Sequence, residues 1–508
     1  MSSKPNANKR FSFLDSLDVD QDVKSRLSIN LFNILSGNSD VYETPMAREH
    51  GSDRILAEWD KVFQANRDIM NDTLINIEES QRSKTGPRSI AKNWSDRREG
   101  VDEYFEQTNL DYSKLSADVP ASRDVSSLRP ISLAKAISLL KNDTNSGLPF
   151  YTRKGKVKDR IMAKFDYLLS RKDPCILFTR TQEQGKTRTV WGFPIADTAN
   201  EMKYYKPLLE FQKRLFWRSA LNGPDHVSKH LTSIIEYAMS NGLVLISIDF
   251  SAFDSTIKPG LILKCFEYIK NLYQSKHVDD LDYICDRMST IGLVTPSGVL
   301  VGPHGVPSGS TFTNEVDSIC QYLIAMSSDV VLGNYFDIQG DDAVYAVKDD
   351  QVVSLFNSFK RYGLNVNEEK SYRSDRYLVY LQNLYHIDYK KGGVINGIYP
   401  TFRALNRILY QERWSNFEDY GISGSDYYAI RTISILENCK HHPLFEKLVR
   451  VVLKYDKYGL QPSQKGINQY VEMMTDSSGT EGILNNQYGD DVKGIKSFET
   501  FKLIKRLR

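Results

Sequence analysis

The sequence is poor in cysteine and has no long apolar run. Its five cysteines, Cys175, Cys265, Cys285, Cys320 and Cys439, lie far apart and form no C-x-x-C pair. This spacing argues against a disulfide framework or a zinc site, and it favours a reducing compartment. No apolar run approaches the ~18 residues of a membrane-spanning helix, and the polar start lacks the apolar core of a secretory signal. We therefore expect no membrane partner.

The sequence also lacks a strong excess of charge of either sign. It has 508 residues with 66 Lys and Arg against 64 Asp and Glu, a net charge of +2. Contact with nucleic acid must therefore depend on local clusters of charge. One such cluster stands out, because residues 151–190 hold eleven Lys or Arg against four Asp or Glu.

Two adjacent carboxylates stand on a glycine-led turn, Gly340-Asp341-Asp342. The flanking runs, 330–336 and 343–347, are rich in Val and aromatic residues, so both are predicted to be β-strands. The turn would then be the tip of a hairpin, where glycine permits a backbone that a Cβ would obstruct. Because neighbouring carboxylates repel, such a tip indicates a nearby cation. An ordinary acidic turn is the alternative.

A third carboxylate is predicted to follow a buried strand. Residues 242–248 are almost continuously apolar, as in a central strand, and Asp249 comes next. A carboxylate there is costly to desolvate unless it meets a metal or a partner, so Asp249 is the natural companion of Asp341. Asp254 lies just before a helix predicted from about residue 258 to 274, where a helix N-cap is a serious alternative.

The basic cluster contains a predicted strand on which Lys186, Arg188 and Val190 share one face. Two cations on one face could clamp a triphosphate, and a solvated basic strand is an equal alternative. The segment 184–187 superficially resembles a P-loop, but the first glycine of that motif is missing. A Walker site is therefore rejected.

Two loops of small residues could let a nucleic-acid backbone pass closely. The first contains Ser146 and Gly147, after a helix predicted at 130–140 and capped at Ser132. The second, 302–311, contains Ser308 and Gly309 and leads into a helix predicted at 312–327. An ordinary loop at a helix end is the alternative in both places.

These motifs follow one order: basic strand, Asp-x4-Asp, Ser-Gly loop before a helix, Gly-Asp-Asp, and then Glu369-Lys370-Ser371. Their order and spacing resemble the viral RNA-dependent RNA polymerases. The resemblance is closest to enzymes of double-stranded RNA viruses of the picobirnavirus type, with partitivirus enzymes next. It covers about residues 144–390, roughly half of the chain. Each motif is weak alone, but together they are specific.

The resemblance implies a mixed α+β fold of the right-hand type, with an antiparallel palm sheet flanked by helices and a helical thumb. The implied domains are an N-terminal fingers extension (1–130), fingers (131–240), palm (241–390, with a fingers insertion near 275–305), and thumb with C-terminal tail (391–508). The implied function is an RNA-directed RNA polymerase that replicates and transcribes a viral RNA genome.

The resemblance also implies the roles of individual residues. Asp249, Asp341 and Asp342 would be catalytic and bind two ions of Mg²⁺ or Mn²⁺. Lys370 would protonate the pyrophosphate, although an exposed lysine near a helix end is the alternative. The residues implied to bind the NTP are Arg180, Lys186, Arg188, Asp254, Thr313, Asn314 and Asp317. Those implied to contact template or product RNA are Ser308, Gly309, Ser146 and Gly147.

The sequence departs from the family pattern in two places. Asp317 stands where many relatives carry Asn, while an Asn is found at position 314. Which of the two completes the contact with the ribose 2′-hydroxyl is therefore open. The motif that usually reads Phe-Leu-Lys-Arg is Tyr-Leu-Gln-Asn at 380–383, without its basic pair. How the primer strand is gripped is open as well.

The implied partners are the RNA template and product duplex, NTPs and a viral capsid protein, and the implied location is the virion interior and host cytoplasm. Two alternative functions remain. A catalytically silent, capsid-associated RNA-binding scaffold would not need all three acids together with Lys186, Arg188 and Lys370. A reverse transcriptase usually has an aromatic-x-Asp-Asp turn, where this chain has Gly340.

Overall fold

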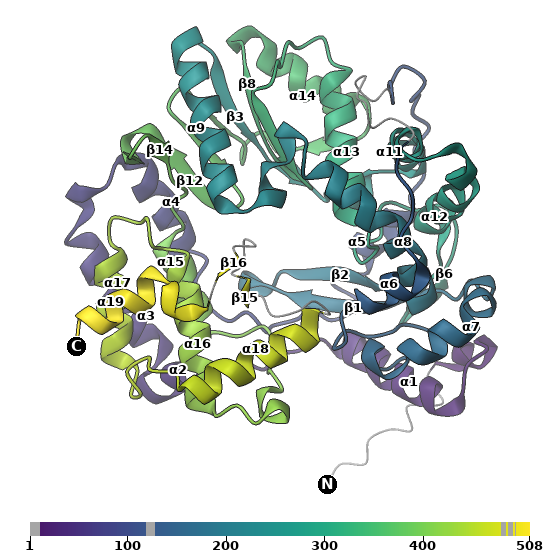
Figure 1. Cartoon of the computed structure of the whole chain (residues 1–508), viewed down its shortest axis with the longest axis horizontal. Coiled ribbons are helices and arrows are strands. Elements are labelled where there is room, and N and C mark those ends of the chain that lie inside the picture. The colour runs from purple at the N-terminus through teal and green to yellow at the C-terminus, as the bar shows by residue number, and fades with distance from the viewer. Residues whose placement is uncertain (1–10, 118–126, 479–483, 486–490, 493) are drawn as a thin grey trace.

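The computed structural model describes residues 11–117, 127–478, 484–485, 491–492 and 494–508. Residues 1–10 and 118–126 of the predicted N-terminal extension lie outside the described residues. Three regions surround the middle of the molecule: a central sheet with its helices, a second sheet, and a layer of C-terminal helices (Figure 1).

The central sheet has four strands, β3 (Val244–Ile248), β7 (Phe336–Gln339), β8 (Asp342–Val347) and β10 (Tyr372–Ser374). They lie in the order β10-β3-β8-β7, and all neighbours are antiparallel. The antiparallel sheet predicted for the palm is therefore present.

Helices cover both faces of the central sheet, because alternate side chains of each strand point to opposite sides. The covering elements are α9 (Pro224–Asn241), α11 (Pro259–Leu272), α13 (Thr313–Met326), α14 (Val352–Arg361) and the hairpin β11–β12 (Tyr377–Tyr380, Asn383–His386). Ile246 and Tyr345 pack into one core with α11, α13 and α14. Leu245 and Val344 pack into another with α9 and β11–β12.

One predicted strand was misplaced. Residues 330–335 are not a strand, because β7 begins only at Phe336. Val330 and Leu332 are buried, but Val331 is 77% exposed, and Gly333 turns the chain with a φ of 56°. The apolar residues there cover the core from a loop, and composition alone does not distinguish such a loop from a strand.

Short elements complete the central region. They are β4 (Phe250–Ser251), α10 (Phe253–Thr256), β9 (Asn365–Val366), β13 (Lys390–Lys391) and β14 (Val394–Ile395). The pairing of β4 with β9 joins the segment after Asp249 to the segment before Lys370.

The second sheet has the order β2-β1-β5-β6. Its strands are β1 (Cys175–Thr181), β2 (Thr187–Gly192), β5 (Leu293–Thr295) and β6 (Gly298–Leu300). β2 is the predicted basic strand, and the hairpin β5–β6 lies within 275–305, where a fingers insertion is predicted. The helices of this region are α1 (Gln21–Ser36), α5 (Arg98–Asp102), α6 (Leu133–Ser138), α7 (Lys158–Ser170), α8 (Ile195–Gln212) and α12 (Val278–Thr290).

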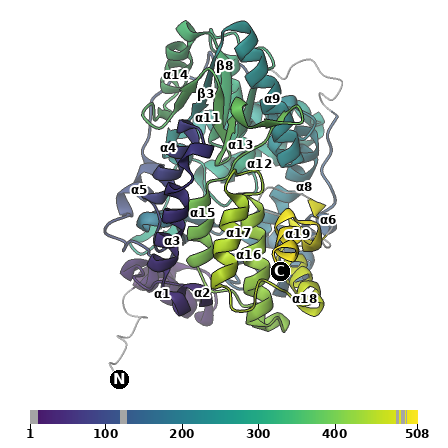
Figure 2. The same ribbon diagram turned by 90° about the vertical axis from the view of Figure 1, so that its left-hand side faces the viewer.

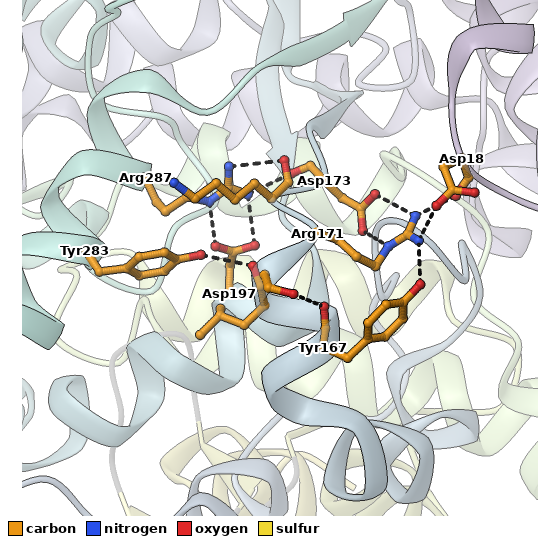
Figure 3. A network of polar contacts seen from close by, with 10 residues as sticks. Asp18, Tyr167, Arg171, Asp173, Asp197, Tyr283 and Arg287 are labelled. Atoms are coloured by element: carbon orange, nitrogen blue, oxygen red, sulfur yellow. Dashed lines mark hydrogen bonds and ion pairs between the residues drawn. The ribbon is translucent and has the colours of Figure 1, made fainter.

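Ion pairs link some of these helices (Figure 3). The guanidinium of Arg287 in α12 donates two hydrogen bonds to the carboxylate of Asp197 in α8, at 2.8 and 3.0 Å, and both side chains are buried. It also donates to the backbone carbonyl of Asp173 at 2.7 Å. The Asp173 carboxylate in turn pairs with Arg171, which also reaches Asp18. One network thus joins α8, α12, the end of α7 and the N-terminal segment.

The C-terminal layer consists of α15 (Thr401–Leu409), α16 (Gly424–Glu437), α17 (Phe445–Tyr455), α18 (Gln464–Ser478), β15 (Leu484–Asn485), β16 (Asp491–Val492) and α19 (Glu499–Arg506). Three N-terminal helices, α2 (Pro45–His50), α3 (Ser52–Gln64) and α4 (Asp72–Arg82), share its core (Figure 2). By contrast, α1 packs against the second sheet. The predicted N-terminal extension thus contributes to two regions, and the domain boundaries themselves stay predictions.

Within the described part of the chain, no helix combines the length and the apolar character needed to cross a membrane.

Candidate active site

The turn between β7 and β8 consists of Gly340 and Asp341, since the residues on either side of them are paired. Gly340 has a φ of 67°, a left-handed conformation that favours glycine. Helix α13 holds the turn in place. The amide of Gly340 donates to Ser318 Oγ at 2.8 Å, and its carbonyl accepts from Gln321 Nε2 at 2.6 Å.

Asp249 follows β3 and lies beside this turn. Since β3 pairs with β8 along its length, the next residue on β3 comes level with Asp342. The amide of Asp249 donates to Ser371 Oγ at 3.1 Å, and its carbonyl accepts from the amide of Asn367 at 2.8 Å. The segment that carries Lys370 is therefore hydrogen-bonded directly to Asp249, the residue that follows β3.

Asp342 is held by the hairpin β11–β12. Its Oδ2 accepts a hydrogen bond from the amide of Leu381 at 2.8 Å. Leu381 and Gln382 form the turn with φ values of 49° and 66°, and non-glycine residues adopt such values only at a cost of about 1 kcal/mol or more each. Burial, together with the charge of Asp341, raises the pKa of Asp342 to about 8. An acid held in this way suits a supporting role.

One cavity of about 820 Å³ is lined by Asp249, Asp341 and Asp342 together with Arg188 and Lys370. Burial raises the pKa of Asp249, the charge of Asp341 raises it further, and Lys370 opposes both. The cavity therefore gathers carboxylates that repel one another and cations that offset part of this repulsion.

A smaller cavity of about 370 Å³ shares Arg188 and Asp341 with the first, and it is also lined by Lys186, Asp254 and Ser308. Burial lowers the pKa of Lys186, and the neighbouring charge of Arg188 adds to the effect. Burial and the charge of Asp341 raise the pKa of Asp254 to about 6. The two predicted triphosphate ligands and the predicted ribose contact thus come together beside the catalytic turn.

Gly309 and Glu201 fix the loop that precedes α13. A Cβ on Gly309 would lie 2.0 Å from the carbonyl oxygen of Trp191, so only glycine fits there. Glu201 of α8 is buried and accepts hydrogen bonds from Ser310 Oγ and from the amide of Thr311, both at 2.7 Å. Burial raises the pKa of Glu201 to about 7. The loop is thereby tied to β2 and to α8.

The polar residues at the start of α13 have different surroundings. Thr313 Oγ1 donates to the carbonyl of Pro307 at 2.9 Å and so closes the loop. Asn314 is exposed and lines the larger cavity. Asp317 is only 5% exposed, its Oδ1 has no hydrogen-bond partner, and burial beside Asp254 raises its pKa well above the usual range. Of the two candidates for a ribose contact, Asn314 is therefore the accessible one.

Six predicted site residues lie outside the lining of these two cavities. Gly309, Thr313 and Asp317 are described above, and the other three are Arg180, Ser146 and Gly147. Arg180 Nε lies 3.8 Å from the carboxylate of Glu412. Ser146 and Gly147 are buried, and a Cβ on Gly147 would lie 2.3 Å from the carbonyl oxygen of Phe193. Their contacts with NTP and RNA stay predictions.

Sequence reasoning missed four buried or partly buried residues that hold the β7–β8 turn, the end of β7 or the loop before α13 in place, namely Arg218, Ser318, Gln321 and Glu201. Their partners lie far away in the sequence, and none of the four belongs to a recognisable motif. The only local signal is polarity within an apolar stretch, as in the run Ile-Cys-Gln-Tyr-Leu that contains Gln321.

Asp249 and Asp341 fit a site for divalent cations. Both offer carboxylate oxygens, which hard cations prefer, and a cation would relieve the repulsion between them. Among the described residues, no group of three or more His, Cys, Asp and Glu side chains is arranged to hold an ion as it stands. The chemistry of the donors fits divalent ions, with Asp249 and Asp341 as the residues that would hold them.

The fold and the site together define a class of protein, the nucleotide-polymerising enzymes of the right-hand type. The model of one family, the viral RNA-dependent RNA polymerases, matches residues 92–453. The chain belongs to this family, and it is an RNA-directed RNA polymerase.

Individual relatives agree with this assignment. The chain is 29% identical over 497 residues to the potential RNA-dependent RNA polymerase of human picobirnavirus (strain Human/Thailand/Hy005102/-), covering 92% of this chain and 89% of the relative. It is 25% identical over 281 residues to the RNA-directed RNA polymerase of Cryptosporidium parvum virus 1 (strain KSU-1), covering 50% and 53%. It matches the crystal structure of the RNA-dependent RNA polymerase of a human picobirnavirus with a TM-score of 0.78, 26% identity and full coverage of both chains.

These similarities confirm the predicted picobirnavirus type, the mixed right-hand fold and the polymerase function over a silent scaffold or a reverse transcriptase. The predicted domains assign the palm to the central sheet, the fingers to the region of the second sheet and the thumb to the C-terminal layer, and these assignments stay predictions. Enzymes of this family bind RNA and NTPs and generally use divalent metal ions.

Proposed function

We propose that this polymerase replicates and transcribes a viral RNA genome by nucleotidyl transfer with two ions of Mg²⁺ or Mn²⁺, held by Asp249 and Asp341. The supporting observation is that both carboxylates line one cavity with Arg188 and Lys370. Such ions, when bound, lower the barrier by activating the attacking 3′-hydroxyl and stabilising the leaving pyrophosphate. Asp342, bonded to Leu381, supports the site.

The basic side chains of the site bind and protonate the triphosphate. Lys186 and Arg188 bind it from the β2 side, and Arg180 of β1 lies directly opposite Arg188 in the same hairpin. Lys370 donates a proton to the pyrophosphate as a general acid. Because the segment of Lys370 is bonded to Asp249, the general acid keeps a fixed position relative to this metal ligand.

The remaining residues recognise the ribose and the RNA strands. Asp254 accepts a hydrogen bond from the 2′-hydroxyl of the NTP, and Thr313 shapes the loop beside it. Ser308 and Gly309 follow the template–product duplex, and the loop of Ser146 and Gly147 guides the template. Both glycines let the two loops pack closely on the chain's own backbone, since a Cβ would meet the carbonyl oxygen of Phe193 at Gly147 and that of Trp191 at Gly309.

We also propose a viral capsid protein as a partner, with the virion interior and the host cytoplasm as the sites of action. The likeness to polymerases of small RNA viruses supports this placement. All five cysteines are buried and unpaired, as suits a reducing compartment. Co-purification of the enzyme with particles assembled from the virus's own capsid protein tests the partnership, and its absence from such particles would contradict it.

The function is tested by incubating the pure protein with an RNA template, labelled NTPs or dNTPs, and Mg²⁺ or Mn²⁺. Labelled RNA should form from NTPs, and Asp341→Asn should lower the rate by about 10³-fold or more while leaving RNA affinity nearly unchanged, since it removes one ligand charge without altering the surface. Asp342→Asn should cost less, about 10- to 100-fold. A lack of product with either metal would refute the proposal.

A further inference from the structure

Arg218 lies fully buried under the catalytic turn, in the short helical segment Phe216–Asn222. It forms a bidentate ion pair with Glu315 of α13, at 2.8 and 3.0 Å, in which both side chains are buried. Its Nη2 also donates to Asn314 Oδ1 at 3.2 Å and to Gln339 Oε1 at 3.3 Å, and its Nη1 to Gln212 Oε1 at 3.2 Å. One guanidinium thus holds α13 and the end of β7 together.

This arrangement sets the direction of the Asn314 amide. A guanidinium has only donors, so it selects the oxygen of any amide that it contacts. Asn314 Oδ1 accepts from Arg218 and also from Gln339 Nε2, at 3.0 Å. The Nδ2 group must then face away from Arg218, toward the catalytic turn, where it would lie 3.0 Å from a Cβ on Gly340. Asn314 therefore presents hydrogen-bond donors to the larger cavity.

The two cavities share Arg188 and Asp341 but differ in their other lining residues. Lys186 and Asp254, which fit the incoming NTP, line the smaller cavity. Asn314 lines the larger one, together with Gln382 of the β11–β12 turn and Lys440 of the thumb. The attacking 3′-hydroxyl must lie beside Asp249 and Asp341, which makes the terminal ribose of the product strand the group next to Gly340.

We propose that Asn314 recognises the ribose of the 3′-terminal product nucleotide by donating a hydrogen bond to its 2′-oxygen, and that Arg218 is the positioning residue that orients it. This inference rests on the proposed function and reassigns Asn314 from the NTP to the growing strand. It also supplies a grip where residues 380–383 lack the basic pair of the family motif. The side-chain amide of Asn314, held by the buried pair of Arg218 and Glu315, would then provide part of the contact with the primer strand.

The test uses self-priming RNA hairpins whose terminal nucleotide is either a ribonucleotide or a 2′-deoxynucleotide, and it measures kcat/KM for the addition of one NTP. Wild-type enzyme should prefer the ribonucleotide end. Asn314→Ala should reduce this preference by about tenfold, the value of one hydrogen bond, and leave the preference for NTP over dNTP unchanged. Asp254→Asn, the matched control in the smaller cavity, should lower the NTP preference alone.

Arg218→Lys keeps the charge beside Glu315, but an ammonium cannot span the same four partners. It should reduce the preference for the ribonucleotide end as much as Asn314→Ala does. The double variant should show no greater reduction than either single variant. If Arg218→Lys does not fold, Gln339→Met removes one of the two bonds to Asn314 Oδ1 without touching the ion pair.

Three results would overturn the inference: equal extension of both ends by the wild type, an Asn314→Ala variant that changes NTP preference instead, or an Arg218→Lys variant that slows both ends equally. A wild type that makes no RNA at all would refute the proposed function as well, so the two failures are distinguishable.

Discussion

Glu201 lies buried beneath the Ser-Gly loop, and burial raises its pKa from 4.5 to about 7. Between these values the folded protein keeps a proton that the unfolded chain releases. The contribution of protonated Glu201 to the free energy of unfolding is therefore complete below pH 4.5 and is lost as the pH rises through about 7. The free energy of unfolding falls by roughly 3 kcal/mol over this range. We expect Glu201→Gln, which cannot ionise, to lose less stability than the wild type between about pH 5 and pH 8. Denaturant titrations at several pH values measure the free energy of unfolding of both proteins. An equal fall in wild type and variant would contradict the role of Glu201.

Gly309 is a second residue whose identity the structure dictates. Its φ is 155°, and an added Cβ would meet a backbone carbonyl at 2.0 Å. Gly309→Ala should therefore displace the loop and lower RNA synthesis by about tenfold or more, because backbone cannot yield as a side chain can. Gly424→Ala is the control, since nothing lies within 4 Å of its Cβ position. Comparable losses of activity in the two variants would argue against the steric explanation.

At the scale of elements, buried ion pairs decide how the helices of the fingers pack. Arg287→Met removes one partner of a pair that lies in the protein interior and leaves Asp197 uncompensated (Figure 3). We expect a loss of about 3–5 kcal/mol in the free energy of unfolding. Arg98→Met breaks the exposed pair with Asp102 and should cost about 1 kcal/mol or less. Chemical denaturation compares the two, and similar costs would refute the role of burial.

The sequence predicted elements with strong periodicity and failed where contacts are distant. Ser132 as the cap of α6 and the hairpin tip at Asp341 follow from local patterns, and both are present. Val331 was placed in a strand because composition cannot show that no partner strand lies beside it. Arg218 was missed for a related reason. Its partner Glu315 is 97 positions away, and a lone arginine in an apolar stretch gives no sign of the pairing.

At the scale of the whole molecule, the N-terminal helices stabilise the thumb. Glu78 of α4 is completely buried and accepts hydrogen bonds from the amides of Thr401 and Phe402, at 2.6 and 3.2 Å. It thus caps α15, more than 300 residues away, in place of a local N-cap residue. No local pattern could have predicted this contact, and residues 1–130 were assigned to a fingers extension by their position in the chain.

We expect Glu78→Ala to loosen this attachment, at a cost of about 1–3 kcal/mol, because it leaves two buried amides without partners. The variant should unfold at a lower temperature and be cleaved faster in the connecting segment 83–91 under limited proteolysis. Glu79→Ala provides the matched control, since that side chain is 41% exposed and pairs with Arg67 on the surface. Faster cleavage of both variants would show that the burial of Glu78 is not the cause.

Helix α13 begins at the Ser-Gly loop and, further along, bonds to the catalytic turn through Ser318 and Gln321. The helix thus connects the proposed RNA-binding loop with the proposed catalytic turn. We expect that displacement of the loop by a translocating duplex would also displace Asp341. A force that opposes stepping, applied to the product strand in an optical trap, will therefore slow bond formation as well as translocation.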